Sequence, residues 1–285
     1  MTTLISWISV DSRGPSAINI VSDSRITWGS DKYRWDTGRK VFSCSPNDIF
    51  GYCGDVLFPS LVLGQLTDLI RDELLWEEDC SADKKHSIIF DFLKSSFEHR
   101  HNAPDRDFSI IHCSKENRGM QSTFHMWHTS FHRKTGEWND NSINVTDCEK
   151  SKLLLALGSG KKSVHDSVKK WENSSQGGTA RAVFSAFCDS LFDGNDLLSG
   201  GMPQIVSIDR SKGARVIGFV LDGNRFIYGL PQNPMSSHSK IEWVDRLFQR
   251  ICPKTGKLLS GAQRHVRPKT SQKGGFARFM RKKRD

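Results

Sequence analysis

The first three residues, Met1-Thr2-Thr3, could provide a nucleophile and its base from a single residue. Removal of an initiator Met before a small residue leaves Thr2 with a free α-amino group. A hydroxyl is a weak nucleophile unless a base takes its proton, and an α-amine with a pKa of about 7.7–8.0 is partly unprotonated near neutral pH. The pattern predicts an N-terminal nucleophile at Thr2, although many proteins begin with Met-Thr and have no such activity.

Five further blocks carry carboxylate, ammonium, hydroxyl or glycine groups in turn-like contexts. Taken singly, each Gly/Ser or Asp block is typical of an ordinary turn, and Lys40, which follows Arg39, is typical of a surface lysine. Their joint order and spacing make them informative. The blocks are Asp-Ser-Arg-Ile-Thr-Trp-Gly at 23–29, Lys40-Val41, Gly-Tyr-Cys-Gly-Asp at 51–55, Gly-Ser-Gly at 158–160 and Asp-Leu-Leu-Ser-Gly-Gly at 196–201.

The elements that must position these blocks follow the order strands, two helices, strands, two helices, strands. Apolar and β-branched runs separated by turn residues predict an opening hairpin over 3–10 and 17–22 and a second strand pair over 40–44 and 49–53. This order favours an α+β fold in which two antiparallel sheets pack together with helices outside. Later strands are expected at 108–111, 122–132, 153–157, 204–209 and 215–221, and helices at 63–74, 88–97, 161–173 and 178–192.

Composition limits the class of protein. The chain has 285 residues, 36% of them hydrophobic, which is enough to fill a core. No run approaches the roughly 20 apolar residues of a membrane-spanning helix, and the N-terminus lacks the layout of a secretory signal. Seven cysteines without a CxxC pair favour reduced thiols. We therefore expect a cytoplasmic protein with no membrane contact.

Positive charge is concentrated at the C-terminus. Residues 252–285 hold eleven of the 41 Lys/Arg residues and one of the 32 acidic residues, a net charge of +10, so residues 1–251 carry −1 of the total of +9. The folded body is therefore close to neutral. We expect residues 231–285 to form an extension, with a short helix at 241–251 and a disordered basic tail that contacts an acidic protein or nucleic acid.

Taken together, the blocks resemble those of the proteasome β-subunit and HslV-type family of N-terminal-nucleophile (Ntn) hydrolases. Residues 23–29 are similar to the DSRxTxG signature of the β-subunits, in register with a terminal Thr, and residues 196–201 to their DxxSGG loop. The resemblance covers residues 2–221. It implies a four-layer αββα sandwich, which we assign to residues 1–230, and amide hydrolysis through an acyl-enzyme on the terminal Thr, with no metal or cofactor.

The resemblance also implies roles for individual residues. Asp23 lies beneath Thr2, and the ammonium of Lys40 lies against the Thr2 hydroxyl and amine. Its charge lowers the pKa of both groups, while Asp23 compensates that charge. The amide of Gly54 points at the developing oxyanion. Two loops converge on the terminal amine through Ser159, Asp196 and Ser199.

On the substrate side, the family's spacing places Ile26, Phe42 and Tyr52 around the pocket beside the scissile bond, with Thr27 also at the bound substrate. An apolar, partly aromatic pocket favours an uncharged substrate side chain. The sequence departs from the family at Asp55, where a small residue is usual, so the shape of that turn is expected to differ.

Assembly and partners follow from the same resemblance. The family forms rings that enclose the active sites, which implies a homo-oligomer that acts on polypeptides. A start one residue before the nucleophile is similar to the bacterial HslV-type peptidases, which work with a AAA+ unfoldase. The set Ser159, Asp196 and Ser199 is closer to that of the β-subunits. We therefore place the chain between the two groups, as a divergent bacterial-style member.

Other functions stay open: a catalytically silent scaffold subunit of the same fold, a non-peptidase amidase, or a basic-tailed binding protein. The silent subunit is disfavoured because the whole set of site residues is present. The residues His125, His128 and His132, with Cys113 and His112 nearby in the sequence, could also be interpreted as a metal site. It is disfavoured because residues three and four apart in a strand do not present ligands to one point.

Overall fold

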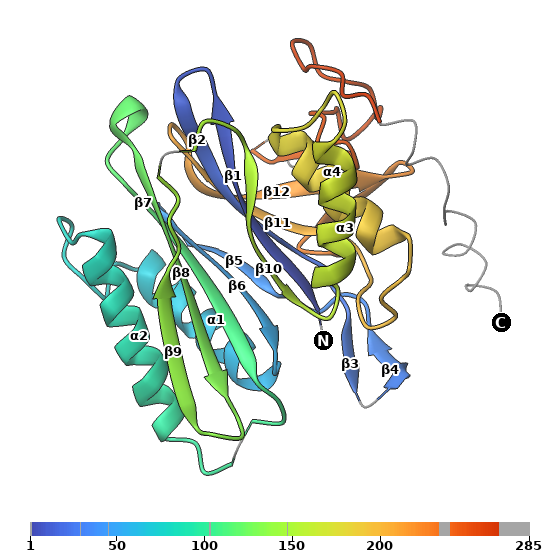
Figure 1. Cartoon of the computed structure of the whole chain (residues 1–285). Helices are drawn as coiled ribbons and strands as arrows, with labels where there is room; N and C mark the ends of the chain where they lie inside the picture. The colour runs from blue at the N-terminus through green and yellow to red at the C-terminus, as the bar shows by residue number, and fades with distance from the viewer. Residues whose placement is uncertain are drawn as a thin grey trace.

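The computed structural model has two β-sheets stacked face to face between two pairs of helices (Figure 1). Helices α1 (Leu57–Arg71) and α2 (Ala82–Glu98) cover one sheet, and α3 (Lys161–Glu172) and α4 (Ala180–Phe192) cover the other. The predicted α+β fold, a four-layer αββα sandwich, is confirmed. The described residues are 2–28, 30–44, 46–102, 104–146, 148–233 and 240–267.

The larger sheet contains the start of the chain. Its strands are β1 (Thr3–Asp11), β2 (Gly14–Ser22), β10 (Lys152–Gly158), β11 (Gln204–Asp209), β12 (Gly213–Leu221), β13 (Asn224–Ile227), β14 (Leu230–Pro231) and β15 (Glu242–Val244). They are ordered β10-β1-β2-β11-β12-β13-β14, with β15 paired to β12. The central pairs β10-β1, β1-β2, β2-β11 and β11-β12 are all antiparallel. The first residues of β1 therefore lie beside the end of β10.

The smaller sheet is an antiparallel meander of β5 (Val41–Cys44), β6 (Asp48–Gly54), β7 (Phe108–Glu116), β8 (Thr123–His132) and β9 (Glu137–Ser142). The sequence analysis missed β9, whose residues are mostly polar and exposed. Its pairing with β8 and the packing of Trp138 against Phe131 hold it in place. A strand of this kind has no apolar alternation to reveal it.

Strand β1 explains why both faces of the larger sheet are buried. Alternate side chains point to opposite faces of a strand. Leu4 and Ile8 enter the core between the two sheets, whereas Ile5 and Trp7 enter the core under α3 and α4. The nearly continuous apolar run of β1 is typical of a strand covered on both sides.

Between β2 and β5 the structure adds a hairpin that the sequence analysis read as turn-rich chain. Strands β3 (Ile26–Trp28) and β4 (Ser30–Trp35) pair only with each other, so six strands precede the first helix, not four. The hairpin projects from the sandwich near the N-terminus (Figure 1). Its exposed large side chains are Trp28, Tyr33 and Trp35.

The C-terminal part of the chain packs more closely than expected. The helix predicted at 241–251 is wrong, because Glu242–Val244 forms β15, parallel to β12. Trp243 is buried against Gly218, where a side chain would collide with its ring. Within the segment predicted to be a disordered tail, His265 stacks on Trp171, with ring centroids 5.1 Å apart. Residues 268–285 lie outside the described residues.

The helices and the cysteines of the described residues can be compared with what the composition predicted. None of its helices is long and apolar enough to cross a membrane. All seven cysteines lie in this part of the chain and carry free thiols.

Candidate active site

The carboxylate of Asp23 is the centre of a buried hydrogen-bond network just after β2. Its Oδ1 accepts from the amide of Thr3 at 3.0 Å and from Nζ of Lys40 at 2.7 Å. Its Oδ2 accepts from the amides of Arg25 at 3.1 Å and Gly200 at 2.9 Å. Four donors match the acceptor sites of one carboxylate. Asp23 therefore ties the start of β1 to Lys40 and to the 196–201 loop.

Lys40 is a buried ammonium with a side chain only 1% exposed, not a surface lysine. Besides Asp23, its Nζ donates to the carbonyl oxygen of Arg25 at 2.5 Å. An ammonium has three N–H groups, so these two bonds do not exhaust it. Burial lowers the pKa of Lys40 from its ordinary value, and the charge of Asp23 opposes that shift.

Thr2 and Thr3 lie where β1 begins, against the Gly-Ser-Gly turn. Thr3 pairs with Gly158. Gly158 has a φ of +86°, and a Cβ there would collide with the carbonyl oxygen of Thr2, so the turn requires glycine. Thr2 itself is 3% exposed. The structure therefore brings Thr2 next to Gly158 and places it one residue before the contact between Thr3 and Asp23.

Ser159, Asp196 and Ser199 form one chain of hydrogen bonds. Both serine hydroxyls donate to Oδ2 of Asp196 at 2.7 Å. The Ser199 Oγ also lies 2.7 Å from Oγ1 of Thr3. Because Ser199 gives its one proton to Asp196, Thr3 is the donor in that bond. The chain therefore reaches β1 through the Thr3 side chain. The predicted contact with the terminal amine stays a prediction.

Gly54 ends β6 with a φ of +100°, and a Cβ there would collide with the carbonyl oxygen of Asp107. The next residue, Asp55, donates its amide to that carbonyl at 3.0 Å and accepts from the amide of Asp105 at 2.8 Å. Asp55 departs from the family pattern and here holds the segment that faces Gly54.

A cavity of about 400 Å³ opens beside Gly54. It is lined by Cys53, Gly54, Arg106, Asp107, Phe108, Ser109, Gly158 and Ser159.

The residues expected to form the substrate pocket do not line this cavity. Ile26, Phe42 and Tyr52 are at most 4% exposed. The Tyr52 hydroxyl donates to the carbonyl oxygen of Arg39 at 3.0 Å, and the Arg39 guanidinium covers the Phe42 ring at 4.3 Å. Thr27 is also buried, and its Oγ1 has no hydrogen-bond partner among the residues described. The expected pocket is filled by its own side chains.

Arg25 is a site residue to which the sequence analysis gave no role, although it belongs to the 23–29 block. Its guanidinium pairs with both oxygens of Asp36, at 2.7 and 3.0 Å, and donates to the carbonyl oxygen of Leu197 at 2.9 Å. Arg25 therefore links the base of the β3-β4 hairpin to the 196–201 loop. The DSRxTxG match was the signal that could have found it.

Gln204, the first residue of β11, is fully buried and was also missed. Its Oε1 accepts from the amide of Lys40 at 2.9 Å. Its Nε2 donates to the Ser24 hydroxyl at 2.9 Å and to the carbonyl oxygen of Gly38 at 2.5 Å. Gln204 thus positions the backbone that carries Lys40. Nothing in its local sequence marks it.

Of the histidines considered for a metal site, His112, His125 and His132 lie within 3.6 Å of carboxylate oxygens. The Nε2 of His128 is buried and has no hydrogen-bond partner among the described residues. His112 Nδ1 lies 3.0 Å from Nδ1 of His86, and each ring places its Nε2 3.0 Å from a carboxylate oxygen, of Asp48 and Asp140 respectively. Within the described ranges, no three His, Cys, Asp or Glu side chains are arranged to hold a metal ion. These rings form a buried polar network beneath α2.

No protein-family model matches the chain, and no curated protein matches its sequence. Among solved structures it is similar to eukaryotic HslV from Trypanosoma brucei, with 11% sequence identity and a TM-score of 0.46, over 72% of this chain and 99% of that chain.

Proposed function

We propose that the chain is an N-terminal-threonine peptidase in which Thr2, once Met1 is removed, attacks an amide carbonyl. The observation that carries the proposal is the buried ion pair of Lys40 and Asp23 at the start of β1. Apolar residues of similar volume often stabilise a fold as well as a buried ion pair does. A pair held at the chain start, where Asp23 also accepts the amide of Thr3, therefore favours a chemical role.

The proposed reaction has two stages. The Thr2 amine takes the hydroxyl proton as Oγ1 bonds to the substrate carbonyl carbon, and the Gly54 amide stabilises the oxyanion. The C–N bond then breaks as the proton passes to the leaving amine, which leaves an ester on Thr2. Water, deprotonated by the same amine, hydrolyses that ester and regenerates the hydroxyl.

The surrounding residues have positioning roles in this proposal. The positive charge of Lys40 favours the deprotonated hydroxyl and the neutral amine. Asp23 holds Lys40 in place. The Thr3 hydroxyl connects the start of β1 to the chain of hydrogen bonds that begins at Ser199. The members of that chain are Ser159, Asp196 and Ser199.

An electrophile of the epoxyketone or β-lactone type tests the nucleophile. Peptide mapping of the wild type should find the adduct on Thr2, and Thr2→Ala should abolish it. The matched control is Thr3→Ser, which keeps a hydroxyl for Ser199 and should still be labelled at residue 2. Labelling that persists in Thr2→Ala places the nucleophile elsewhere, and an intact mass that retains Met1 excludes the mechanism.

A silent scaffold subunit is the second candidate, because Phe42 and Tyr52 fill the place of the expected substrate pocket. The same experiment separates the two. A protein whose mass shows Met1 removed, but which takes up no electrophile and cleaves no peptide, is a scaffold.

We further propose a cytoplasmic homo-oligomeric ring that degrades polypeptides with a AAA+ partner. The β3-β4 hairpin exposes three large aromatic side chains, Trp28, Tyr33 and Trp35, which would be covered in an assembly contact. Light scattering on the full-length protein is the direct measurement, and a fully active monomer would contradict the ring.

A further inference from the structure

Arg106 places a positive charge in the cavity beside the candidate site. It is half-buried and lines that cavity together with Gly54 and Ser159. Its side chain makes no hydrogen bond or ion pair with any residue in the described part of the chain. A partly desolvated guanidinium without a partner gains most when an anion reaches it.

The backbone on both sides of Arg106 is anchored. Asp55 bonds to the amide of Asp105 and to the carbonyl oxygen of Asp107. Arg133 donates its own amide to Oδ1 of Asp107 at 2.9 Å and its guanidinium to the carbonyl oxygen of Asp105 at 3.2 Å. The Cα of Arg106 therefore lies between two fixed residues, which limits where its side chain can reach.

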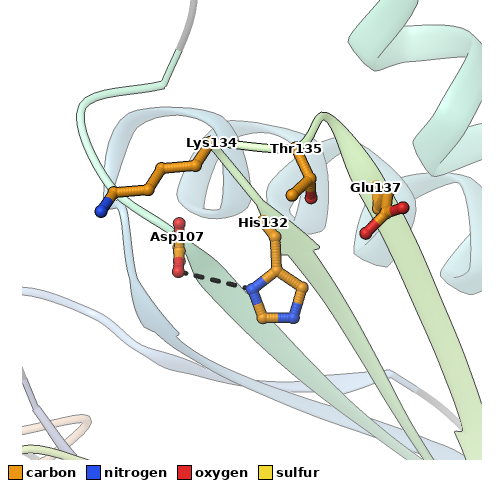
Figure 2. A pocket seen from close by; sticks show the side chains of 5 residues that line it. All are labelled: Asp107, His132, Lys134, Thr135 and Glu137. Atoms are coloured by element: carbon orange, nitrogen blue, oxygen red, sulfur yellow. Dashed lines mark hydrogen bonds and ion pairs between the residues drawn. The ribbon is translucent and has the colours of Figure 1, made fainter.

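Asp107 lines both this cavity and its neighbour, but its carboxylate forms no ion pair with Arg106 among the described residues. It turns toward His132, whose Nδ1 lies 3.4 Å from its Oδ2, in a second hollow of about 340 Å³ (Figure 2). The bond from the Arg133 amide, assisted by His132, holds the pKa of Asp107 below its ordinary value. Lys134 lines this second hollow and not the first.

We propose that Arg106 binds a carboxylate of the substrate next to the scissile amide, so that the site selects acidic peptides. This inference rests on the proposed hydrolase function. A guanidinium matches a carboxylate with two parallel hydrogen bonds, and Ser109 and Ser159 line the same cavity. The volume of about 400 Å³ falls in the range of roughly 300–1,000 Å³ that ligand sites occupy.

The test compares fluorogenic peptides that differ only beside the cleaved bond, with Asp, Asn, Glu, Gln or Lys at each flanking position. Peptides with a free or an amidated C-terminus separate a side-chain carboxylate from a terminal one. Wild-type kcat/KM should favour the acid over its amide by roughly tenfold or more. Arg106→Gln should abolish this ratio, and Arg106→Glu should shift the preference to Lys.

Lys134→Gln is the matched control, because it removes a positive charge from the neighbouring hollow only. It should keep the acid preference. Equal rates for acid and amide peptides, or an equal loss of preference in Lys134→Gln, would overturn the inference and leave the peptidase proposal standing.

Failure of every peptide to be cleaved counts against the proposed function itself. The binding inference is then decided by calorimetry on Thr2→Ala with acetyl-Ala-Ala-Asp and acetyl-Ala-Ala-Asn amides. Tighter binding of the Asp peptide that disappears with Arg106→Gln supports it. Equal affinity for the two peptides refutes it.

Discussion

Nζ of Lys40 lies 2.7 Å from Oδ1 of Asp23, and the two side chains are at most 1% exposed. Asp23 follows β2 of the larger sheet, whereas Lys40 precedes β5 of the smaller one. The pair therefore joins the two sheets at the end of the sandwich where β1 begins. Because both charges are out of water, removal of either one leaves the other uncompensated.

Substitution of Lys40 should affect both activity and folding. Lys40→Ala leaves Asp23 as a buried charge and should lower the free energy of unfolding by about 3–5 kcal/mol. Lys40→Arg keeps the charge, but its planar group cannot occupy the place of the ammonium between Asp23 and the Arg25 carbonyl. We expect it to lose about 10²–10⁴-fold in kcat/KM. Wild-type turnover in a folded Lys40→Arg protein would remove Lys40 from the mechanism.

Gly54→Ala should be far more damaging than Gly14→Ala, although the φ angles are nearly equal at +100° and +101°. Each substitution carries the strain of a positive φ, of order 1–3 kcal/mol. A Cβ at Gly14 meets open space, whereas one at Gly54 collides with the Asp107 backbone. Chemical denaturation should therefore show the larger loss for Gly54→Ala, together with loss of activity. Equal losses of stability in the two variants would show that the Asp107 backbone moves aside to admit a Cβ at Gly54.

Gln204→Leu tests a residue that positions the site without contacting substrate. Leucine has a similar volume but leaves the Lys40 amide and the Gly38 carbonyl without their bonds. We expect a loss of about 2–4 kcal/mol in the free energy of unfolding, with activity reduced in parallel. The exposed Gln121→Leu serves as the control and should change stability by less than about 0.5 kcal/mol.

Acid should weaken the contact between the C-terminal segment and α3. Burial, with a smaller effect from the Arg181 charge, lowers the pKa of His265 to about 4. The unfolded chain binds a proton at His265 from about pH 6.5 downward, before the folded chain does. Stability is therefore fully present above pH 6.5 and falls as the pH drops toward 4.

The matched variant is His265→Gln, which cannot titrate. Its free energy of unfolding should fall less steeply between pH 6.5 and 4, by an amount of order 1–2 kcal/mol across the window. An identical slope in the two proteins would show that His265 does not couple folding to pH.

Two C-terminal deletions should behave differently. Deletion of 268–285 removes seven of the eleven basic residues counted from 252 onward, and should weaken salt-sensitive binding to an acidic partner while small-peptide hydrolysis persists. Deletion of 252–285 also removes Leu258 from its core cluster and His265 from Trp171. It should lower the melting temperature, and equal melting temperatures for the two deletions would show that this packing is not stabilising.

Local patterns in the sequence were enough to predict the main elements of the sandwich and to identify the residues of the proposed chemistry. The opening hairpin, the two helix pairs and the strands at 204–209 and 215–221 follow from apolar periodicity and turn residues, which act over short distances. Asp23, Lys40 and Ser159 were found because their blocks keep a recognisable order.

The tertiary structure alone decided what surrounds those residues. Gln204 supports Lys40 across 164 positions of sequence, and Arg106 reaches the cavity only because Asp55 and Arg133 anchor its neighbours. Strand β15 forms by parallel pairing with Ile217–Phe219 of β12, where local periodicity had favoured a helix. Each outcome depends on tertiary contacts between groups far apart in the sequence, and short-range propensity carries no information about such contacts.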